Sequence, residues 1–519
     1  MTVPPTRRLL LSLAVTAIVS CGPEAAPPPA DVLGAIKADR GAEVVKQLTA
    51  PELEGRGTEG KGLELAANYL AGRFAEAGLK PAGDGGGFFQ RLQVTTGVKL
   101  QDKRNWVRFG DGPARRSLKL DIEFTPLSLA AGDARATGPL VFVGYGITAP
   151  EAGYDDYAGL DVKGKVVVAM RWAPGAHLQE KGARVPVGRK PIPALYQELR
   201  FKAMNARAHG AAGLVVFNGT RSEGGAEDAL IKLGGTQGQD DAGLPVVQVI
   251  RPVLEELLGA DKLREAQEQI DATFTPRSFA VPATVPELKI QTALDRERKD
   301  AANVVGVVEG ADPALKGEWV VVGAHYDGLG KGGPGSLAPE AKAVHPGADD
   351  NASGVAALCV VADAMSKARP KRSVAFVAFA GEEVGLLGST LFAKSAPGKL
   401  VAMINLDMVG RLGGRQLVVQ GTDTAKEWSE ILGAANADNL TLGAGGETYG
   451  PSDHTSFSAR GVPALFLFTG AHADYHRPGD TADKIDFGGI EKVARFTFRV
   501  ARALADRPAA LTSVRGTRP

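Results

Sequence analysis

The sequence predicts an α/β fold in which a mixed, largely parallel sheet is sandwiched by helices. From about Pro286 to the end, uninterrupted apolar runs alternate with helical segments. The apolar runs are EWVVVGAHYD, SVAFVAFAGEE, LVAMINLD and GVPALFLF, and the helical segments are 354–367, 425–437 and 489–505. Apolar runs without polar alternation are typical of parallel strands that are buried on both faces.

The first half of the chain adds other kinds of segment. Residues 31–79 have a helical pattern, and residues 90–145 alternate as β-strands do, for example in FFQRLQVTT and LKLDIEFTPLSL. Residues 130–280 contain short apolar strands with glycine turns and a helix or two. A chain of 519 residues is too long for one ordinary core, so we expect two domains and two terminal extensions.

The composition is that of a soluble globular protein, with 44% hydrophobic and 23% charged residues. Lys and Arg number 60 and Asp and Glu number 59, which leaves almost no net charge. This balance argues against a basic nucleic-acid surface and against an acidic tail.

The N-terminus is typical of an export signal. Arg7 and Arg8 precede an apolar run, Leu9 to Val19, that is too short to span a bilayer. Cys21 follows a small residue, which resembles a bacterial lipobox and implies a signal peptide over residues 1–20, a lipidated Cys21 and a tether over residues 21–30. An ordinary secretory signal is the alternative. We therefore expect an exported, lipid-anchored protein of the bacterial cell envelope, either periplasmic or surface-facing.

The remaining cysteine, Cys359, lies in an apolar helical segment. A single cysteine after the anchor excludes a disulfide framework, so we expect Cys359 to be a small core residue.

Metal-binding residue types stand at the ends of three apolar runs. His325 and Asp327 end the first, Glu382 and Glu383 the second, and Asp407 the third. Ligands of open α/β sheets bind at the carboxyl ends of the strands, and this donor set suits Zn²⁺. Five of the seven histidines also fall in this part of the chain, namely His325, His345, His454, His472 and His476.

Two pairs of adjacent carboxylates allow more than one interpretation. In HPGADDNASG, residues 345–354, Asp349 and Asp350 stand before an apolar helix, where they would either cap the helix or bind a cation. Glu382 and Glu383 would either be a solvated strand end or serve metal chemistry. Consecutive side chains point in different directions, so one glutamate can bind metal while the other remains free as a base.

Several motifs together resemble the M28 family of co-catalytic zinc aminopeptidases: VVVGAHYDG, GADDNASG, FAGEEVGLLGS, NLDMVGR, SDH and DYHRPGDT, in this order. The resemblance is strong over residues 286–505 and looser over 31–100, and residues 130–280 resemble the protease-associated (PA) domain inserted in many such enzymes. It implies a catalytic domain in two parts, 31–129 and 281–508, a mostly-β PA insertion at 130–280 and a tail at 509–519.

The resemblance also implies two zinc ions held by five side chains: His325, Asp350, Glu383, Asp407 and His476. Asp350 would bridge the two ions. One ion would be completed by His325 and Asp407, and the other by Glu383 and His476. The peptide bond between Asp350 and Asn351 would be cis, and Asp349 would be a structural neighbour.

Further roles follow from the same resemblance. Glu382 would be the general base and Asp327 would orient the imidazole of His325. Tyr449, in TYGPSDHTSF, would stabilise the oxyanion, with Tyr475 as the alternative. We expect His454 near the cleft but not on a metal. Arg411 would pair with a carboxylate near the site or form a structural salt bridge, and His345 and His472 receive no role in the site.

The implied activity is hydrolysis of the peptide bond at the free N-terminus of a peptide, with the PA insertion restricting access to the cleft. Three alternatives remain. A glutamate carboxypeptidase-like exopeptidase needs a basic pocket, and no arginine cluster is evident in the catalytic half. Glutaminyl cyclases use one zinc ion and lack a PA insertion. Non-catalytic ectodomains of the transferrin receptor type have lost metal ligands, whereas this sequence contains all five and Glu382.

Overall fold

The computed structural model describes residues 30–514 apart from residues 59, 102, 150–151, 176–184, 191, 193, 220–227, 234–240, 333–334 and 446–451. The expected signal peptide, Cys21, the tether up to residue 29 and Tyr449 lie outside the described residues. Within them, none of the helices combines the length and the apolar character that a membrane span requires.

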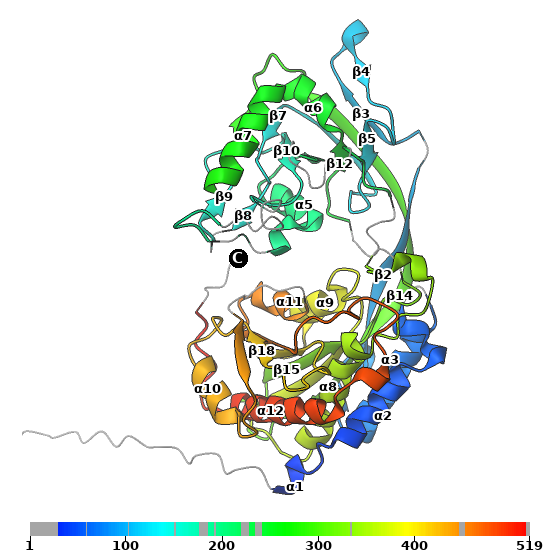
Figure 1. The fold of residues 1–519 in the computed structure, drawn as a ribbon, viewed down its shortest axis with the longest axis vertical. Coiled ribbons are helices and arrows are strands. Elements are labelled where there is room, and N and C mark those ends of the chain that lie inside the picture. Colours follow the sequence, from blue (N-terminus) through cyan, green and yellow to red (C-terminus); the bar gives the residue numbers. More distant parts are fainter. Residues whose placement is uncertain are drawn as a thin grey trace, which may run out of the picture.

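Two modules make up the described chain, as Figure 1 shows. The larger module contains the N-terminal helices and everything from residue 303 onward, and the inserted module contains the strands and helices between residues 105 and 293. Each has its own hydrophobic clusters. Those of the larger module are built around the helix at 354–365 and its sheet, and those of the inserted module around the strands at 140–142, 166–170, 213–217 and 246–249.

The larger module contains a mixed, largely parallel sheet, which confirms the predicted fold class. Its order is β19, β18, β20, β17, β15, β16 and β14. Pairing is parallel from β16 through β15 and β17 to β20, and antiparallel where β14 meets β16 and β18 meets β20. The bounds are β14 Leu288–Val308, β15 Glu318–His325, β16 Ser373–Phe379, β17 Lys399–Leu406, β18 Leu417–Gln420, β19 Leu442–Gly445 and β20 Ala464–Phe468.

Helices cover both faces of this sheet. In Figure 1, α8 and α12 lie on one face, where α8 contacts α2 and α12 and α12 contacts α10; α9 and α11 lie on the other face and contact each other. Nearly every side chain of α8 is buried, which is expected of a helix that is apolar all round. The bounds are α1 Ala30–Leu33, α2 Ala38–Leu48, α3 Gly62–Glu76, α8 Gly354–Met365, α9 Leu387–Ser395, α10 Trp428–Ala435, α11 His454–Ser458 and α12 Phe487–Asp506.

The inserted module contains a six-stranded sheet in the order β13, β7, β10, β11, β12 and β5. The four central strands are parallel and the two edge strands antiparallel. The strands span β5 Phe124–Pro126, β7 Leu140–Phe142, β10 Val166–Met170, β11 Gly213–Phe217, β12 Val246–Val249 and β13 Phe279–Ala280, and the accompanying helices span α5 Leu199–Ala208, α6 Arg251–Leu258 and α7 Ala260–Thr273.

One predicted strand is much shorter than its sequence pattern. The alternating stretch LKLDIEFTPLSL, residues 118–129, forms only β5. The chain turns before it, because the amides of Glu123 and Phe124 both donate to the carbonyl of Lys119 and Asp121 adopts a left-handed conformation with φ of 59°. Such a turn removes residues from the sheet even though their hydrophobicity alternates.

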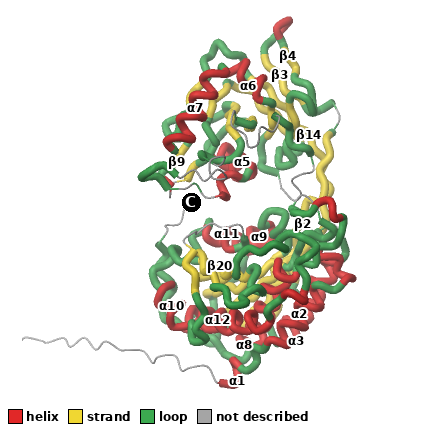
Figure 2. Tube along the Cα trace, in the orientation of Figure 1, coloured by secondary structure: helices red, strands yellow, loops and turns green. Residues whose placement is uncertain are grey.

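Strand β14 connects the two modules, as its position in Figures 1 and 2 makes clear. Its first residues pair with β3 (Trp106–Phe109) and β6 (Asp133–Gly138), and its last residues pair with β16. Between these ends it pairs with β2 (Phe89–Leu100), and the register shifts between Glu297 and Arg298. The middle of β14 is exposed, from Asp295 to Asp300 except for the half-buried Arg296.

Candidate metal centre

Three neighbouring strands deliver ligand-type side chains to one edge of the sheet. His325 is the last residue of β15, Asp407 follows β17 directly, and Glu382 and Glu383 follow β16 after a short turn. Because β15 is paired in parallel with both β16 and β17, all three strands end at the same edge. The buried apolar strands thus fix where each polar residue emerges.

Asp350 comes from the turn that precedes α8. The Asp350–Asn351 peptide bond is cis, as the family resemblance implied. The Asn351 side chain accepts hydrogen bonds from the amides of Gly354 and Met408 and donates to the carbonyl of Leu406. It therefore fastens this turn to the backbone on both sides of Asp407. The sequence alone does not indicate this role of Asn351, because these contacts join segments far apart in the chain.

The helix-cap interpretation of the paired aspartates is wrong. The N-cap residue of α8 is Ser353, whose side chain makes no capping hydrogen bond, and the amide of the first helical residue, Gly354, donates to Asn351. Asp349 instead accepts a hydrogen bond from the amide of Gly410 at 2.7 Å, and its other carboxylate oxygen lies 3.1 Å from His472 Nε2.

Asp350 lies between two histidines. Its Oδ1 is 3.3 Å from His325 Nε2 and its Oδ2 is 3.2 Å from His476 Nε2. His325 Nε2 is also 3.5 Å from Asp407 Oδ1, and His476 Nε2 is 3.3 Å from Glu383 Oε2. The five predicted ligands are therefore brought together as two groups that share Asp350.

These donor sets fit metal ions. Tetrahedral zinc with bonds of about 2.0–2.1 Å places two donor atoms roughly 3.3 Å apart, which is the spacing found here. Within each group the donor atoms lie within 4.8 Å of one another. In the described part of the chain, the buried Asp407 Oδ1 accepts no hydrogen bond, although its position suits a metal bond.

The electrostatics of the two histidines also favour a cation. Burial lowers the pKa of His325, but the nearby carboxylates of Glu382 and Asp407 outweigh it and the pKa is raised well above its ordinary value. For His476, burial likewise lowers the pKa, and hydrogen bonds to Asp350 and Glu383 raise it to about 10. The carboxylates thus favour positive charge at both imidazoles, which a bound divalent ion can supply instead.

Glu382 lies beside these groups and is partly exposed. Burial raises its pKa well above the ordinary range; Glu383 and Asp453 raise it further, whereas His325 lowers it. A third possible ligand group contains His325, Glu382 and Glu383, so the geometry also allows Glu382 to approach a metal.

Asp327 contacts both predicted partners. Its carboxylate accepts hydrogen bonds from the amides of Glu382 and Glu383, at 3.1 and 3.2 Å. Its Oδ1 lies 3.8 Å from His325 Nδ1, a looser contact than the predicted orienting role implies. Asp327 thus holds the turn that carries the paired glutamates at least as firmly as it orients His325.

The other ligands have supports that sequence analysis missed. Ser452 Oγ donates to Asp407 Oδ2 at 2.6 Å and accepts from Asn405 Nδ2 at 2.7 Å. The carbonyl of Gly335 lies 2.8 Å from His476 Nδ1, which orients that ring. Ser452 stands in the SDH motif, in which the sequence points only to the histidine.

Arg56 ties the N-terminal segment to the site. Its guanidinium is fully buried and donates to the carbonyls of Leu48, Tyr326, Pro346 and Gly347. The Tyr326 and Gly347 contacts brace the chain next to His325 and just before the paired aspartates. Burial lowers the pKa of Arg56 to about 10.

The structure describes three of the four remaining candidate residues. Tyr475 stacks on the ring of His476, with centroids 3.8 Å apart, whereas Tyr449 lies outside the described residues. His454 is the first residue of α11 and stacks on Phe466, outside all of the ligand groups. Arg411 pairs with Asp480 and Asp474.

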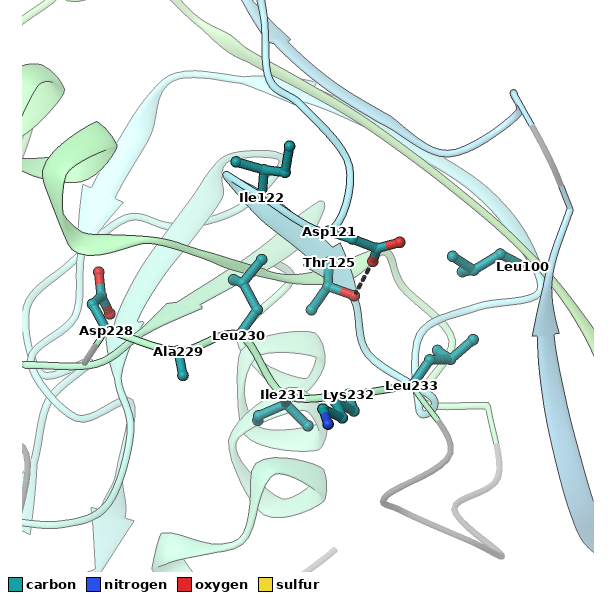
Figure 3. Close-up of a pocket in the computed structure, with 10 residues that line it drawn as sticks. All are labelled: Leu100, Asp121, Ile122, Thr125, Asp228, Ala229, Leu230, Ile231, Lys232 and Leu233. Atoms are coloured by element: carbon teal, nitrogen blue, oxygen red, sulfur yellow. Dashed lines mark hydrogen bonds between the residues drawn. The ribbon is translucent and has the colours of Figure 1, made fainter. Parts of the chain in front are cut away.

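A pocket in the inserted module, shown in Figure 3, is distinct from this centre. It is lined mostly by the segment 228–233, by Ile122 and by Thr125, whose hydroxyl lies 3.5 Å from Asp121 Oδ1. The metal-ligand groups found among the described residues all lie in the larger module, so this pocket has no comparable chemistry.

Two families of known domains match this chain. Residues 303–501 match the model of peptidase family M28, and residues 136–257 match that of the PA domain. The first range contains all five candidate ligands, and the second lies within the inserted module.

Known proteins are similar over part or all of the chain. A probable leucine aminopeptidase of Arthroderma otae is 31% identical over 37% of this chain and 56% of its own length. An aminopeptidase of Pseudomonas aeruginosa is 28% identical over 52% of this chain and 45% of its own. This chain thus spans about half the length of these relatives. The structure of an aminopeptidase from Aneurinibacillus sp. strain AM-1 is 24% identical, with a TM-score of 0.51 over 93% of this chain and 97% of that one, which shows a shared fold.

Proposed function

We propose that this chain, whose residues 303–501 match peptidase family M28 and whose residues 136–257 match the PA domain, is a co-catalytic di-zinc aminopeptidase that removes N-terminal residues from peptides. The observation that carries this proposal is Asp350, which directs one carboxylate oxygen to each of two histidines. A carboxylate between two histidine–carboxylate groups suits a two-metal hydrolytic site, whose ions lie about 3.5–4 Å apart. The names of the similar proteins agree with this activity.

The side chains of the centre would have separate roles in metal binding and proton transfer. Asp350 would hold both ions, with His325 and Asp407 on one and Glu383 and His476 on the other. When bound, zinc supplies Lewis-acid activation of water and of the scissile carbonyl. Glu382, beside these cations, would be ionised, since positive charge within about 4–6 Å favours a carboxylate. It would take a proton from the attacking water and transfer it to the leaving amine.

A tyrosine would stabilise the oxyanion. Tyr449 is our choice from the sequence motif, with Tyr475 as the alternative because its ring stacks on His476. In Figure 1 the inserted module stands on the side of α9, which follows the paired glutamates, and of α11, which begins at the histidine of the SDH motif. We propose that the PA domain limits access to this side, so that short peptides and chain ends are preferred.

The test is release of free amino acids from short peptides, with N-acetylated and C-amidated versions of each, before and after chelation and zinc restoration. An aminopeptidase loses zinc-dependent cleavage on acetylation and keeps it on amidation. The reverse result would favour a carboxypeptidase. No turnover by the zinc-loaded protein would favour a cyclase or a binding protein.

We also propose that the protein is exported and anchored by lipid at Cys21 in a bacterial envelope, from the motif in residues 1–21. Cys21→Ser should move the protein from the membrane fraction to the soluble fraction of the expressing cells. An unchanged distribution would contradict the lipid anchor.

A further inference from the structure

Asp480 is a buried carboxylate that holds the backbone in front of the bridging ligand. It is 2% exposed. Its Oδ2 accepts hydrogen bonds from the amides of both Asp349 and Asp350, at 2.8 and 3.0 Å. Its carbonyl also accepts from the amide of Ala348 at 3.1 Å. Three consecutive amides therefore converge on one residue.

The same side chain links three ligand-bearing segments. Asp480 stands four residues after His476 in DYHRPGD. Its Oδ1 accepts from Arg411 Nη2 at 3.0 Å, and Arg411 stands four residues after Asp407. The segments that carry Asp350, His476 and Asp407 thus meet at one carboxylate.

This position matters because Asp350 has to satisfy two metal ions at once. Both of its oxygens must be held close to a histidine, and metal sites tolerate displacements of only about 0.5 Å. Hydrogen bonds from amides to an ionised carboxylate are among the stronger ones in proteins, so they restrict the peptide from which Asp350 projects.

Asp474 provides a comparison within the same network. It lies 3.5 Å from Arg411 Nη2 and 2.7 Å from Lys484 Nζ. No hydrogen bond joins it to the amides of residues 348–350, which the structure describes. Asp474 therefore shares the Arg411 ion pair with Asp480 but not the contact to the backbone of the bridging ligand.

We propose that Asp480 is a positioning residue for the metal centre, which fixes the bridging Asp350 relative to the loops of His476 and Asp407. This rests on the proposed function insofar as the centre binds metal. Asp480 touches neither metal nor substrate in this proposal; it acts through the Asp349–Asp350 backbone.

The test is zinc affinity, measured on the full chain by competition with a chromophoric chelator and without substrate. Asp480→Asn places an amide N–H₂ against either the guanidinium or the two backbone amides, so one set of hydrogen bonds is lost. We expect zinc binding at least at one site to weaken 10–100-fold, the usual effect of removing the support of a ligand. The matched control, Asp474→Asn, should bind both ions as wild type does.

Wild-type zinc affinity in folded Asp480→Asn would overturn the proposal, and so would equal weakening in Asp474→Asn. If circular dichroism shows Asp480→Asn to be unfolded, Asp480→Glu replaces it. That variant keeps the charge but carries it one methylene farther, so weaker zinc binding is again expected and wild-type affinity would contradict us. Failure of both variants to fold would indicate a general structural role and count against the proposal. Wild-type protein that binds two zinc ions but hydrolyses no peptide would contradict the proposed function alone.

Discussion

At the scale of single residues, the two adjacent glutamates show how neighbouring side chains divide their roles. Glu383 lies 3.3 Å from His476, in the group that contains Asp350. Glu382 is partly exposed and its amide, like that of Glu383, is held by Asp327. The shared anchor fixes both backbones, so the two side chains can be compared by equivalent substitutions.

Replacing Glu382 by Gln should lower kcat by about 10²–10⁴-fold, the usual contribution of a general base. The zinc content should stay at that of wild type, because five other side chains hold the ions. Glu383→Gln is the matched control and should lose zinc from the group of His476. Zinc content by elemental analysis and turnover of an amino-acid anilide measure the two effects. Loss of zinc from Glu382→Gln would make Glu382 a ligand instead.

His454 should make stability depend on pH. Burial lowers its pKa to about 3, so the folded protein excludes the charged form that the unfolded chain adopts below about 6.5. The folded pKa is depressed, so the unfolded state binds more protons and stability falls as pH drops below 6.5. Between pH 6.5 and 5 the free energy of unfolding should fall by about 2 kcal/mol through this group.

The measurement is urea unfolding of metal-free wild type and His454→Gln from pH 7.5 to 5. The stability difference between them should shrink as pH falls, because the variant lacks the titrating group. Parallel curves would contradict this account of His454.

How well the site could be predicted also depends on the individual residue. His325, Asp407 and the paired glutamates follow apolar runs, so their location at one sheet edge is encoded locally. Asn351, Ser452 and Asp480 act through backbone or side-chain contacts with distant segments. No local pattern distinguishes such residues from ordinary polar loop residues, because the partner is defined only by the folded chain.

At the scale of elements, α8 is the centre of the larger module. It contacts α2 and α12 along one face and β15 and β16 on another. The apolar run that forms it begins directly after the turn carrying Asp350, so packing of the helix and placement of the bridging ligand are linked. Its existence was predictable from the length of the apolar run, whereas the turn before it depends on contacts from Asn351 and Asp480.

Leu358→Ala in α8 should destabilise the larger module by about 2–5 kcal/mol, since the side chain is fully buried and its removal leaves a cavity. Leu65→Ala in α3 is the same substitution at a side chain that is 47% exposed, and it should change stability by no more than about 0.5 kcal/mol. Chemical denaturation followed by circular dichroism gives both values. Similar losses in the two variants would contradict the central role of α8.

At the scale of the whole molecule, the two modules have separate cores and share β14. The length of the chain predicts two domains. The sequence could not reveal that one strand serves both, because the middle of β14 is the charged stretch DRERKD, which resembles a break between elements. Only its pairing with β2 shows that the strand continues through this stretch.

Metal removal should therefore affect the modules differently. Zinc at 1,000 times its dissociation constant stabilises the state that binds it by about 4 kcal/mol. Calorimetry should resolve two unfolding transitions. Chelation should lower the midpoint temperature of only one of them, that of the larger module, where all candidate ligands lie. Zinc restoration should reverse the shift. Equal shifts of both transitions would show that the modules unfold as one unit.

The shared strand also constrains the order in which the chain can fold. β2 leaves the ribosome long before β14, and the whole inserted module lies between them in sequence. Their pairing closes a very long loop, whose entropic cost falls when the intervening residues are already compact. We therefore expect the inserted module to fold first. The sheet of the larger module would then pair with a β14 whose first residues are already ordered.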